Sequence, residues 1–358
     1  MIDLRPIFYV VGRILVVLAI LMLAPAIIDW RAGLENGADF LESAIITGAV
    51  GLMLSVATAN GLAGGLNARQ AYLMTAMIWG SVFVAQRLGM DAIGPFLYTG
   101  LRFALAALVL LPLLAYTAAK QTIPGEPWSN RGLLFGGAMM GLVLALGINL
   151  QQVGLLFTSV TNSGFITGLY VIIVPLIGLF IGHKTGLGIW LGAILAVVGM
   201  FLLCVGDNFQ VASGDWLQLA GAFVWAVHVL LVGFFASRHD PLRLAVIQFI
   251  TCALISLALA LLFEEIQLQA IIAAGPAILY GGILGVAIGF TLQVVAQKDA
   301  IASHAAIIFS LEAVFAAMAG AWFLGETLEL RGYLGCVLML AGMLLAQLWP
   351  RQLVQPAR

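Results

Sequence analysis

The chain is dominated by long apolar runs separated by short polar segments. A transmembrane helix needs about 20 mostly apolar residues at a rise of 1.5 Å per residue. Runs of this length, bounded by charged residues or proline, predict twelve spans. They cover approximately residues 8–28, 44–62, 71–88, 94–116, 133–152, 160–182, 187–205, 215–236, 241–262, 275–296, 301–324 and 330–349. The pattern therefore predicts an all-α polytopic membrane protein.

The charges between these spans predict an orientation. With an even number of spans and a cytoplasmic N-terminus, eleven Lys and Arg residues fall in inner segments and three in outer loops. This positive-inside bias predicts that both termini face the cytoplasm and that the protein lies in the cytoplasmic (inner) membrane. The alternative is that Arg5, Arg13 and the apolar run that follows form a cleavable signal peptide, which would leave eleven spans.

The composition excludes several classes of protein. Of 358 residues, 63% are hydrophobic and 9% charged, with a mean hydropathy of +1.12, whereas soluble domains carry roughly 25% charged residues. The 15 Lys and Arg against 16 Asp and Glu leave no basic excess for a nucleic-acid partner. The three cysteines show no paired spacing. No nucleotide loop, metal-ligand cluster or nucleophile–base arrangement is visible, so we expect no enzyme activity, cofactor or metal.

The sequence after the first two spans contains an internal repeat. An offset of 142 or 143 residues aligns several positions, and an offset of 146 aligns one more. The aligned pairs include Gly147 and Gly289, Gln151 and Gln293, Gly192 and Gly335, Gly199 and Gly342, and Trp79 and Trp225. Five spans per repeat would insert the second repeat upside down relative to the first, a feature of transporters. The alternative is chance coincidence in a Gly- and Leu-rich chain.

The repeat predicts four segments. Residues 1–70 form an N-terminal transmembrane hairpin, 71–210 the first five-helix repeat, 211–349 the second, and 350–358 a cytoplasmic tail. The predicted fold is therefore a hairpin followed by a ten-helix bundle of two inverted repeats.

Motifs in residues 71–349 resemble a known family. They comprise Met77–Val84 (MIWGSVFV), Leu101–Phe103 (LRF), Thr158–Ile166 (TSVTNSGFI) with Val174–Leu176, Ser310–Glu312 and Phe323–Glu326. In this order they resemble the EamA-type drug/metabolite transporters. Ala313 departs from the pattern, because a proline commonly follows the Glu. The resemblance implies ten helices in two inverted repeats around a central cavity, usually for export of small metabolites.

The first hairpin resembles a different family. Arg5-Pro6, Gly12-Arg13 and Leu66–Leu73 are similar to the opening hairpin of Trk-type potassium-uptake membrane subunits. The Gly-containing selectivity loops of that family are not visible later in the chain, so its conduction chemistry is not carried over. A potassium-uptake subunit or channel-like protein is nevertheless the alternative function that this hairpin suggests.

Amides extend a stripe of small residues on the third helix of each repeat. The two stripes are Gly137, Gly141, Ala145, Asn149 and Gln152, and Gly281, Gly285, Gly289, Gln293 and Gln297. Small residues permit close helix contact, and amides on the same face can line a cavity or bond across helices. Asn149, Gln152 and Gln293 are therefore candidate substrate-binding residues, with pure packing as the alternative.

Charged groups within spans are costly, at roughly 2.5 to 3.5 kcal/mol each on insertion scales. Glu312 lies near the middle of its span, with His304 about 12 Å away along the helix. Both are candidates for proton coupling, and His304 also for substrate binding. The 142-residue offset pairs them with Tyr170 and Asn162, two further candidates for substrate binding. Arg102 is interpreted as a structural charge that bonds helix-end carbonyls, although it could bind a substrate carboxylate or neutralise Glu312.

Aromatic residues occupy the first helix of each repeat. Trp79, Phe83 and Trp225 are candidate cavity walls, with lipid contact or packing as the alternative. Together these residues predict a secondary transporter that exports a small polar or amphipathic metabolite, such as an amino acid, by alternating access. Its expected partners are that solute, the lipid bilayer and, as a candidate coupling ion, the proton. A membrane scaffold without transport activity is a third hypothesis.

Overall fold

The computed structural model describes residues 67–120, 126–182, 186–204, 212–298, 302–323 and 330–349, together with Tyr9, Arg13, Val16 and Leu52. The chain forms two compact units, Met1–Ala71 and Tyr72–Arg358. Within the first unit, the Arg13 guanidinium donates hydrogen bonds to the Tyr9 hydroxyl. The first two predicted spans lie almost wholly outside the described residues.

The described residues are helical and contain no strand. The helices are α3 (Ala68–Gly89), α4 (Pro95–Lys120), α5 (Arg131–Leu155), α6 (Val160–Gly168), α7 (Tyr170–Phe180), α8 (Leu187–Cys204), α9 (Ser213–Ala236), α10 (Pro241–Phe263), α11 (Leu268–Ala273), α12 (Gly275–Tyr280), the π-helix η2 (Gly281–Phe290), α13 (Thr291–Gln297), α14 (Ala302–Phe309), α15 (Glu312–Phe323) and α16 (Leu330–Leu348). Each predicted span from residue 71 onward falls on one of these helices or on a consecutive group of them.

Seven helical segments in the described ranges are long and apolar enough to cross a membrane, and two shorter apolar helices accompany them. Large apolar side chains are exposed along these helices; Leu262 and Phe263, for example, are 74% and 71% exposed. Such exposure is unfavourable in water but is expected where lipid is the solvent. The chain is thus an all-helical membrane protein with several transmembrane helices.

Side-chain caps define where several helices begin. The Asn130 side chain accepts a hydrogen bond from the Gly132 N–H at the start of α5, and Ser159 accepts one from Asn162 at the start of α6. Asp240 does the same for two N–H groups at the start of α10, where Pro241 occupies the first helical position. Each cap satisfies N–H groups that have no partner within the helix.

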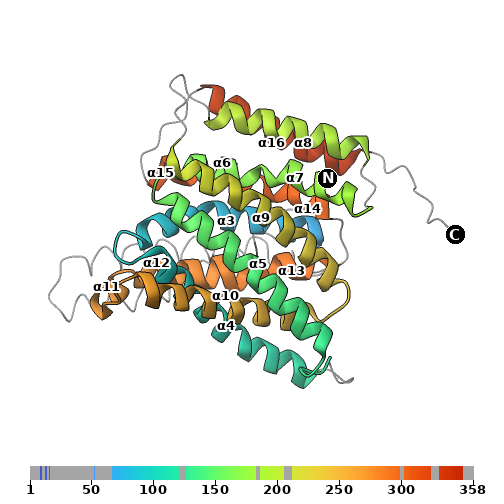
Figure 1. The fold of residues 1–358 in the computed structure, drawn as a ribbon. Helices are drawn as coiled ribbons and strands as arrows, with labels where there is room; N and C mark the ends of the chain where they lie inside the picture. Colours follow the sequence, from blue (N-terminus) through green and yellow to red (C-terminus); the bar gives the residue numbers. More distant parts are fainter. Residues whose placement is uncertain are drawn as a thin grey trace. The chain divides into compact units, whose positions relative to one another are not determined.

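Helices of the two predicted repeats pack in reciprocal pairs. α4 lies against its counterpart α10, and α8 lies against its counterpart α16. In the fourth span of each repeat the halves cross over, so that α6 contacts α15 and α7 contacts α14. One further contact is matched as well, since α5 packs on α10 as η2 packs on α4. Figure 1 shows α8 beside α16 at the top of the view and α4 beside α10 at the bottom. Such reciprocity is what a two-fold relation between two similar halves produces.

Glycines in α8 and α16 fix the direction of that pair. A Cβ on Gly192 would lie 2.7 Å from the Gly342 carbonyl oxygen, and one on Gly199 would lie 2.5 Å from that of Gly335. The aligned counterparts of Gly192 and Gly199 are Gly335 and Gly342, so each glycine meets the counterpart of the other. The two helices therefore run antiparallel, and only glycine permits so close an approach.

The fourth span of each repeat is broken at a matched position. The break between α6 and α7 lies at Leu169, and the break between α14 and α15 lies at Ser310 and Leu311. Leu169 donates its N–H to the Ile166 carbonyl, and Leu311, 142 residues later, donates to Ile308. These bonds reach back three residues instead of four, which tightens the helix locally. The sequence predicted one continuous helix at both places.

Candidate functional site

A cavity lies at the centre of the second unit, where both repeats meet. Its wall is formed by α3, α4, α5, α6, α7, α9, η2, α13 and α15. Its volume is about 40 Å³, enough for a few water molecules. Seven of the residues singled out from the sequence line it: Trp79, Phe83, Arg102, Tyr170, Trp225, Gln293 and Glu312.

Glu312 and Tyr170 contact each other on the cavity wall. The Tyr170 hydroxyl donates a hydrogen bond of 3.0 Å to Glu312 Oε1, and both side chains are buried. The residues are aligned counterparts, 142 positions apart, and each begins the helix that follows a break. A residue and its counterpart can touch only where the two halves meet symmetrically. This contact therefore marks the pseudo-two-fold axis.

Arg102 supplies the cation of the cavity. Its Nη2 donates a hydrogen bond of 3.2 Å to Gln152 Oε1, and its guanidinium lies over the Tyr98 and Phe103 rings at 5.0 and 5.5 Å from the ring centroids. The partner in this bond is thus a side-chain amide, not the helix-end carbonyls that the sequence suggested. Among the described residues, no ion pair joins Arg102 to Glu312.

Aromatic rings form one side of the cavity. The Phe290 ring lies between two of these rings. Its centroid is 4.7 Å from that of Trp79 and 5.8 Å from that of Trp225, and the Trp225 ring stacks on the Phe290 ring. Trp79 also donates its indole N–H to the Gly285 carbonyl at 3.2 Å. Because Gly285 and Phe290 belong to η2, the widened helix of the second repeat presents its backbone and its ring to the first helix of the first repeat.

Several polar atoms on the cavity wall have no hydrogen-bond partner among the described residues. They are Gln86 Oε1, Arg102 Nε, Trp225 Nε1 and both amide atoms of Gln293, and all are buried. A buried polar atom without a partner costs about 1 to 3 kcal/mol, and such atoms are rare in folded proteins. Nine further atoms of this kind lie elsewhere in the described residues. The five on the cavity wall differ in that they face a space in which a polar molecule would supply their partners.

Four predicted site residues lie away from the cavity wall. Asn149 is buried and donates to the Ala145 carbonyl and to Ser256 Oγ, 2.7 and 2.8 Å away. Gln152 Oε1 accepts a hydrogen bond from Arg102, and Gln152 does not line the cavity. Asn162 and His304 are only partly buried, and the backbone N–H of Asn162 is bound by the Ser159 cap.

The glycine stripe explains why Asn149 and Gln152 do not reach the cavity. A Cβ on Gly137 would collide with Ile247, and one on Gly141 with Thr251, so the stripe faces α10. Asn149 follows the same face and meets α10 at Ser256. The interpretation as a packing face is therefore the one that this geometry favours for the first repeat.

Gln86, Gln151 and Phe290 also line the cavity but were not among the predicted site residues, although Gln86 shares a helix face with Trp79 and Phe83. Gln151 could have been found, because the 142-residue offset aligns it with Gln293, and the two amides face the same space. Phe290 had no such signal, since one more aromatic residue in an apolar run is unremarkable. Among the described residues, no group of His, Cys, Asp and Glu has the arrangement of a metal site.

Comparisons with known proteins place this geometry in context. The model of the EamA-like transporter family matches twice, over residues 64–205 and 212–348. An uncharacterized transporter of Archaeoglobus fulgidus is 28% identical, over 77% of this chain and 84% of that protein. The uncharacterized inner membrane transporter YedA of Escherichia coli is 27% identical, over 59% and 69%.

Two further similarities concern chemistry and fold. A protein of Streptantibioticus cattleyicolor, described as a "Probable terminal-alkyne amino-acid exporter", is 26% identical over 77% of this chain and 91% of its own length. A solved crystal structure has a TM-score of 0.66 and 19% identity over 81% of this chain and 99% of that chain, which shows the fold alone.

These comparisons decide between the two resemblances found in the sequence. The doubled match covers both five-helix segments and begins only at residue 64. They give no support to the resemblance of the first hairpin to a potassium-uptake subunit. The chain belongs to the EamA-like transporter family and is a membrane transporter.

Proposed function

We propose that this transporter is a secondary carrier that exports a small zwitterionic metabolite, such as an amino acid, across the cytoplasmic membrane by alternating access. The observation that carries the proposal is the group of unpartnered polar atoms on the cavity wall, above all both amide atoms of Gln293. A polar solute in the cavity would supply the missing hydrogen bonds.

The charges of the cavity favour a solute with both a carboxylate and an ammonium group. Arg102 is suited to a carboxylate, and its Nε is unpartnered among the described residues. Glu312 can accept an ammonium beside its bond to Tyr170. The rings of Trp79, Phe290 and Trp225 would hold an apolar side chain or the cation itself. The similarity to a protein described as an amino-acid exporter supports the same class of solute.

The arrangement of the two repeats, 71–210 and 211–349, supports alternating access. Reciprocal helix pairs, the antiparallel α8–α16 contact and the Tyr170–Glu312 contact are all expected of inverted repeats. The breaks beside Tyr170 and Glu312 resemble the discontinuous helices of transporters. Because the cavity holds only a few water molecules, an amino acid can enter only when its walls part.

The orientation follows from the charges between spans. Both termini face the cytoplasm, so residues 120–131 and 236–243 lie at the inner face and residues 89–95 and 263–268 at the outer face. Thiol labelling of single-cysteine variants at Arg31 and Lys184 tests this orientation, with opposite sides as the expected result. Equal labelling from one side would exclude the arrangement of twelve spans.

Transport in liposomes tests the function. Purified protein should move labelled amino acids down an imposed gradient, and an imposed proton gradient should accelerate this movement if Glu312 carries a proton. The Glu312→Gln variant should then transport at a rate that no longer responds to pH. His304→Gln serves as the comparison, because His304 lies off the cavity wall. An unchanged response in Glu312→Gln would remove Glu312 from coupling, and no movement of any zwitterion would remove the proposed substrate class.

No observation in the described residues favours the potassium-uptake alternative. Failure of the full chain to support growth of a potassium-uptake mutant at limiting potassium is the expected result. Rescue of growth would reopen that alternative.

A further inference from the structure

Two glutamates, Glu126 and Glu264, occupy equivalent places in the two repeats. Glu126 follows α4, the second helix of the first repeat, and Glu264 follows α10, the second helix of the second repeat. Each carboxylate crosses to the other repeat and binds where its second helix begins. Pro95 and Pro241, the first residues of these helices, are 146 positions apart, the same offset that aligns Trp79 with Trp225.

Glu264 caps α4 directly. Its Oε1 accepts the Phe96 N–H at 2.7 Å and its Oε2 accepts the Leu97 N–H at 2.8 Å. A carboxylate at a helix N-terminus satisfies free N–H groups and interacts favourably with the helix dipole. Gly94 occupies the cap position without a side chain, and a Cβ there would collide with the Glu264 carboxylate. The cap of α4 is thus supplied by the other repeat.

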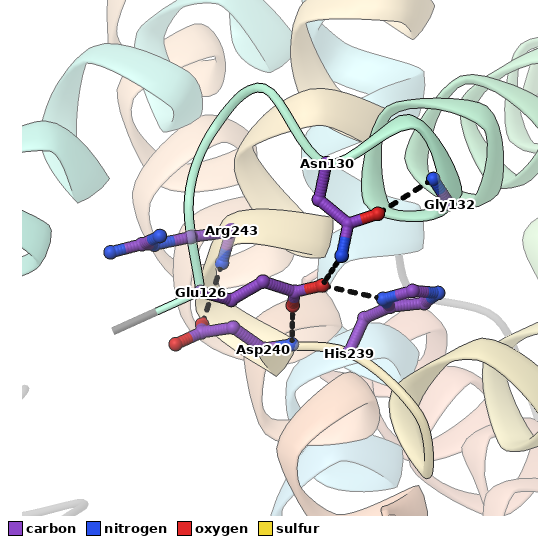
Figure 2. Close-up of polar contacts among 6 residues, drawn as sticks. All are labelled: Glu126, Asn130, Gly132, His239, Asp240 and Arg243. Atoms are coloured by element: carbon purple, nitrogen blue, oxygen red, sulfur yellow. Dashed lines mark hydrogen bonds and ion pairs between the residues drawn. The ribbon is translucent and has the colours of Figure 1, made fainter. Parts of the chain in front are cut away.

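Glu126 does not bind the N–H groups in the first turn of α10, because that helix already has a cap. Asp240 caps α10 with its own side chain, and Glu126 Oε2 accepts the Asp240 backbone N–H at 2.8 Å. Glu126 Oε1 accepts hydrogen bonds from His239 Nδ1 at 2.7 Å and from Asn130 Nδ2 at 2.6 Å. Figure 2 shows these side chains converging on the Glu126 carboxylate between the start of α5 and the start of α10.

The two glutamates act at opposite ends of α10, which runs antiparallel to α4. Phe96 lies 6.3 Å from Phe263, and Phe103 lies 5.9 Å from Phe249, between ring centroids. The start of α4 therefore lies beside the end of α10, and the two helices are antiparallel. Glu264 joins the end of α10 to the start of α4, whereas Glu126 joins the start of α10 to Asn130 at the start of α5.

We propose that Glu264 and Glu126 are a pair of clamps that hold α10 at both membrane faces, to α4 through Glu264 and to the start of α5 through Glu126. In this proposal α4 and α5, packed on α10, form the static wall of the cavity, and access opens along the broken helices α6–α7 and α14–α15. The inference rests on the proposed alternating access and names the wall that moves. Hydrogen bonds to a carboxylate are stronger than bonds between neutral groups, so separation at either end is costly.

The opposite wall has the features of a moving element. Its helices are interrupted at Leu169 and at Ser310–Leu311, next to the cavity. The contact between α6 and α15 is made by small residues, since a Cβ on Gly164 would lie 3.1 Å from the Ala316 Cβ. Small smooth surfaces can slide or part at little cost compared with interlocked rings.

Two covalent locks test which wall opens. Both are made in a background in which Cys204, Cys252 and Cys336 are replaced by Ala. The first lock is the double variant Gly94→Cys and Glu264→Cys, in which a covalent cross-link replaces the outer clamp. Gly164→Cys with Ala316→Cys locks the broken helices. A short thiol cross-linker should leave transport by the first variant within about twofold and reduce transport by the second at least tenfold, reversibly on reduction if a disulfide is used.

Three outcomes would overturn the proposal. They are loss of transport on locking Gly94 to Glu264, full transport after locking Gly164 to Ala316, and equal effects of both locks.

A second measurement does not depend on transport activity. Spin labels at Phe96 and Phe263 should give one narrow distance distribution at every pH and solute condition. Two populations at this pair would mean that α4 and α10 separate, even if the substrate assignment were wrong.

Discussion

Two polar clusters lie at the boundary between the repeats: the cavity and the Glu126 junction, which comprises Glu126, Asn130, His239 and Asp240. They differ in hydrogen bonding. In the junction, both carboxylate oxygens of Glu126 accept bonds and Asn130 uses its amide at both ends. In the cavity, neither amide atom of Gln293 has a partner among the described residues. The difference teaches that bonded polar groups join the repeats at the junction, whereas the unpartnered groups of the cavity face a space that another molecule can enter.

The largest expected effect is on transport when the cavity loses its cation. Arg102→Ala should reduce the rate of zwitterion transport at least tenfold, because a hydrogen bond to a charged group contributes about 1.5 to 3 kcal/mol. Arg102→Lys keeps the charge without the planar fork and should recover part of the rate. Initial rates in liposomes, normalised to folded protein, measure the effect. Equal rates for wild type and a folded Arg102→Ala variant would contradict the comparison.

A second prediction separates binding from folding on one helix. Gln293→Ala should raise KM roughly two- to tenfold, the effect of about 0.5 to 1.5 kcal/mol of lost hydrogen bonding, and should leave the melting temperature unchanged. No protein group among the described residues loses a partner in this variant. Substrate-dependent initial rates and thermal melts measure the two effects.

Gln297→Ala is the matched control, four residues further along α13. Gln297 is equally buried and lies off the cavity wall; its Nε2 donates to the Val229 carbonyl at 3.0 Å, whereas its Oε1 has no partner among the described residues. Its removal should lower the free energy of unfolding by about 1 kcal/mol and leave KM unchanged. A raised KM in Gln297→Ala, or a lowered melting temperature in Gln293→Ala, would contradict the distinction between the two amides.

The smallest expected effect concerns the junction and depends on pH. Burial raises the pKa of Glu126, but the Asp240 N–H, the His239 hydrogen bond and the nearby cations lower it more, so this pKa lies below its ordinary value of 4.5. A carboxylate with a lowered pKa stabilises the folded state above its unfolded pKa and loses this effect as the pH falls through the folded value.

Glu126→Gln should therefore lower the melting temperature at neutral pH by the equivalent of about 1 kcal/mol. Thermal melts of both proteins between pH 7 and pH 3 should show the difference shrinking below pH 4.5. A difference that grows on acidification would contradict the assigned sign. Transport at pH 7 by the folded variant should keep the wild-type KM, because Glu126 does not line the cavity.

The sequence predicted the helices well because their apolar lengths are set by the bilayer. The predicted span 94–116 corresponds to α4 (Pro95–Lys120), and the span 241–262 corresponds to α10 (Pro241–Phe263). The repeat was also readable, since the offset of 142 that aligns Tyr170 with Glu312 joins two residues that touch. Hydrophobic length and self-similarity are properties of the chain itself, and they need no knowledge of packing.

Only the tertiary structure decided which face of each helix meets the cavity. Asn149 and Gln152 shared a stripe with the glycines, and that stripe packs on α10, whereas Gln151, about 100° round the helix, faces the cavity. The breaks beside Tyr170 and Glu312 and the crossing of Glu126 and Glu264 between repeats were also invisible in sequence. Apolar periodicity is weak in helices surrounded by lipid and protein alike, so the rotation of each helix is set by its neighbours.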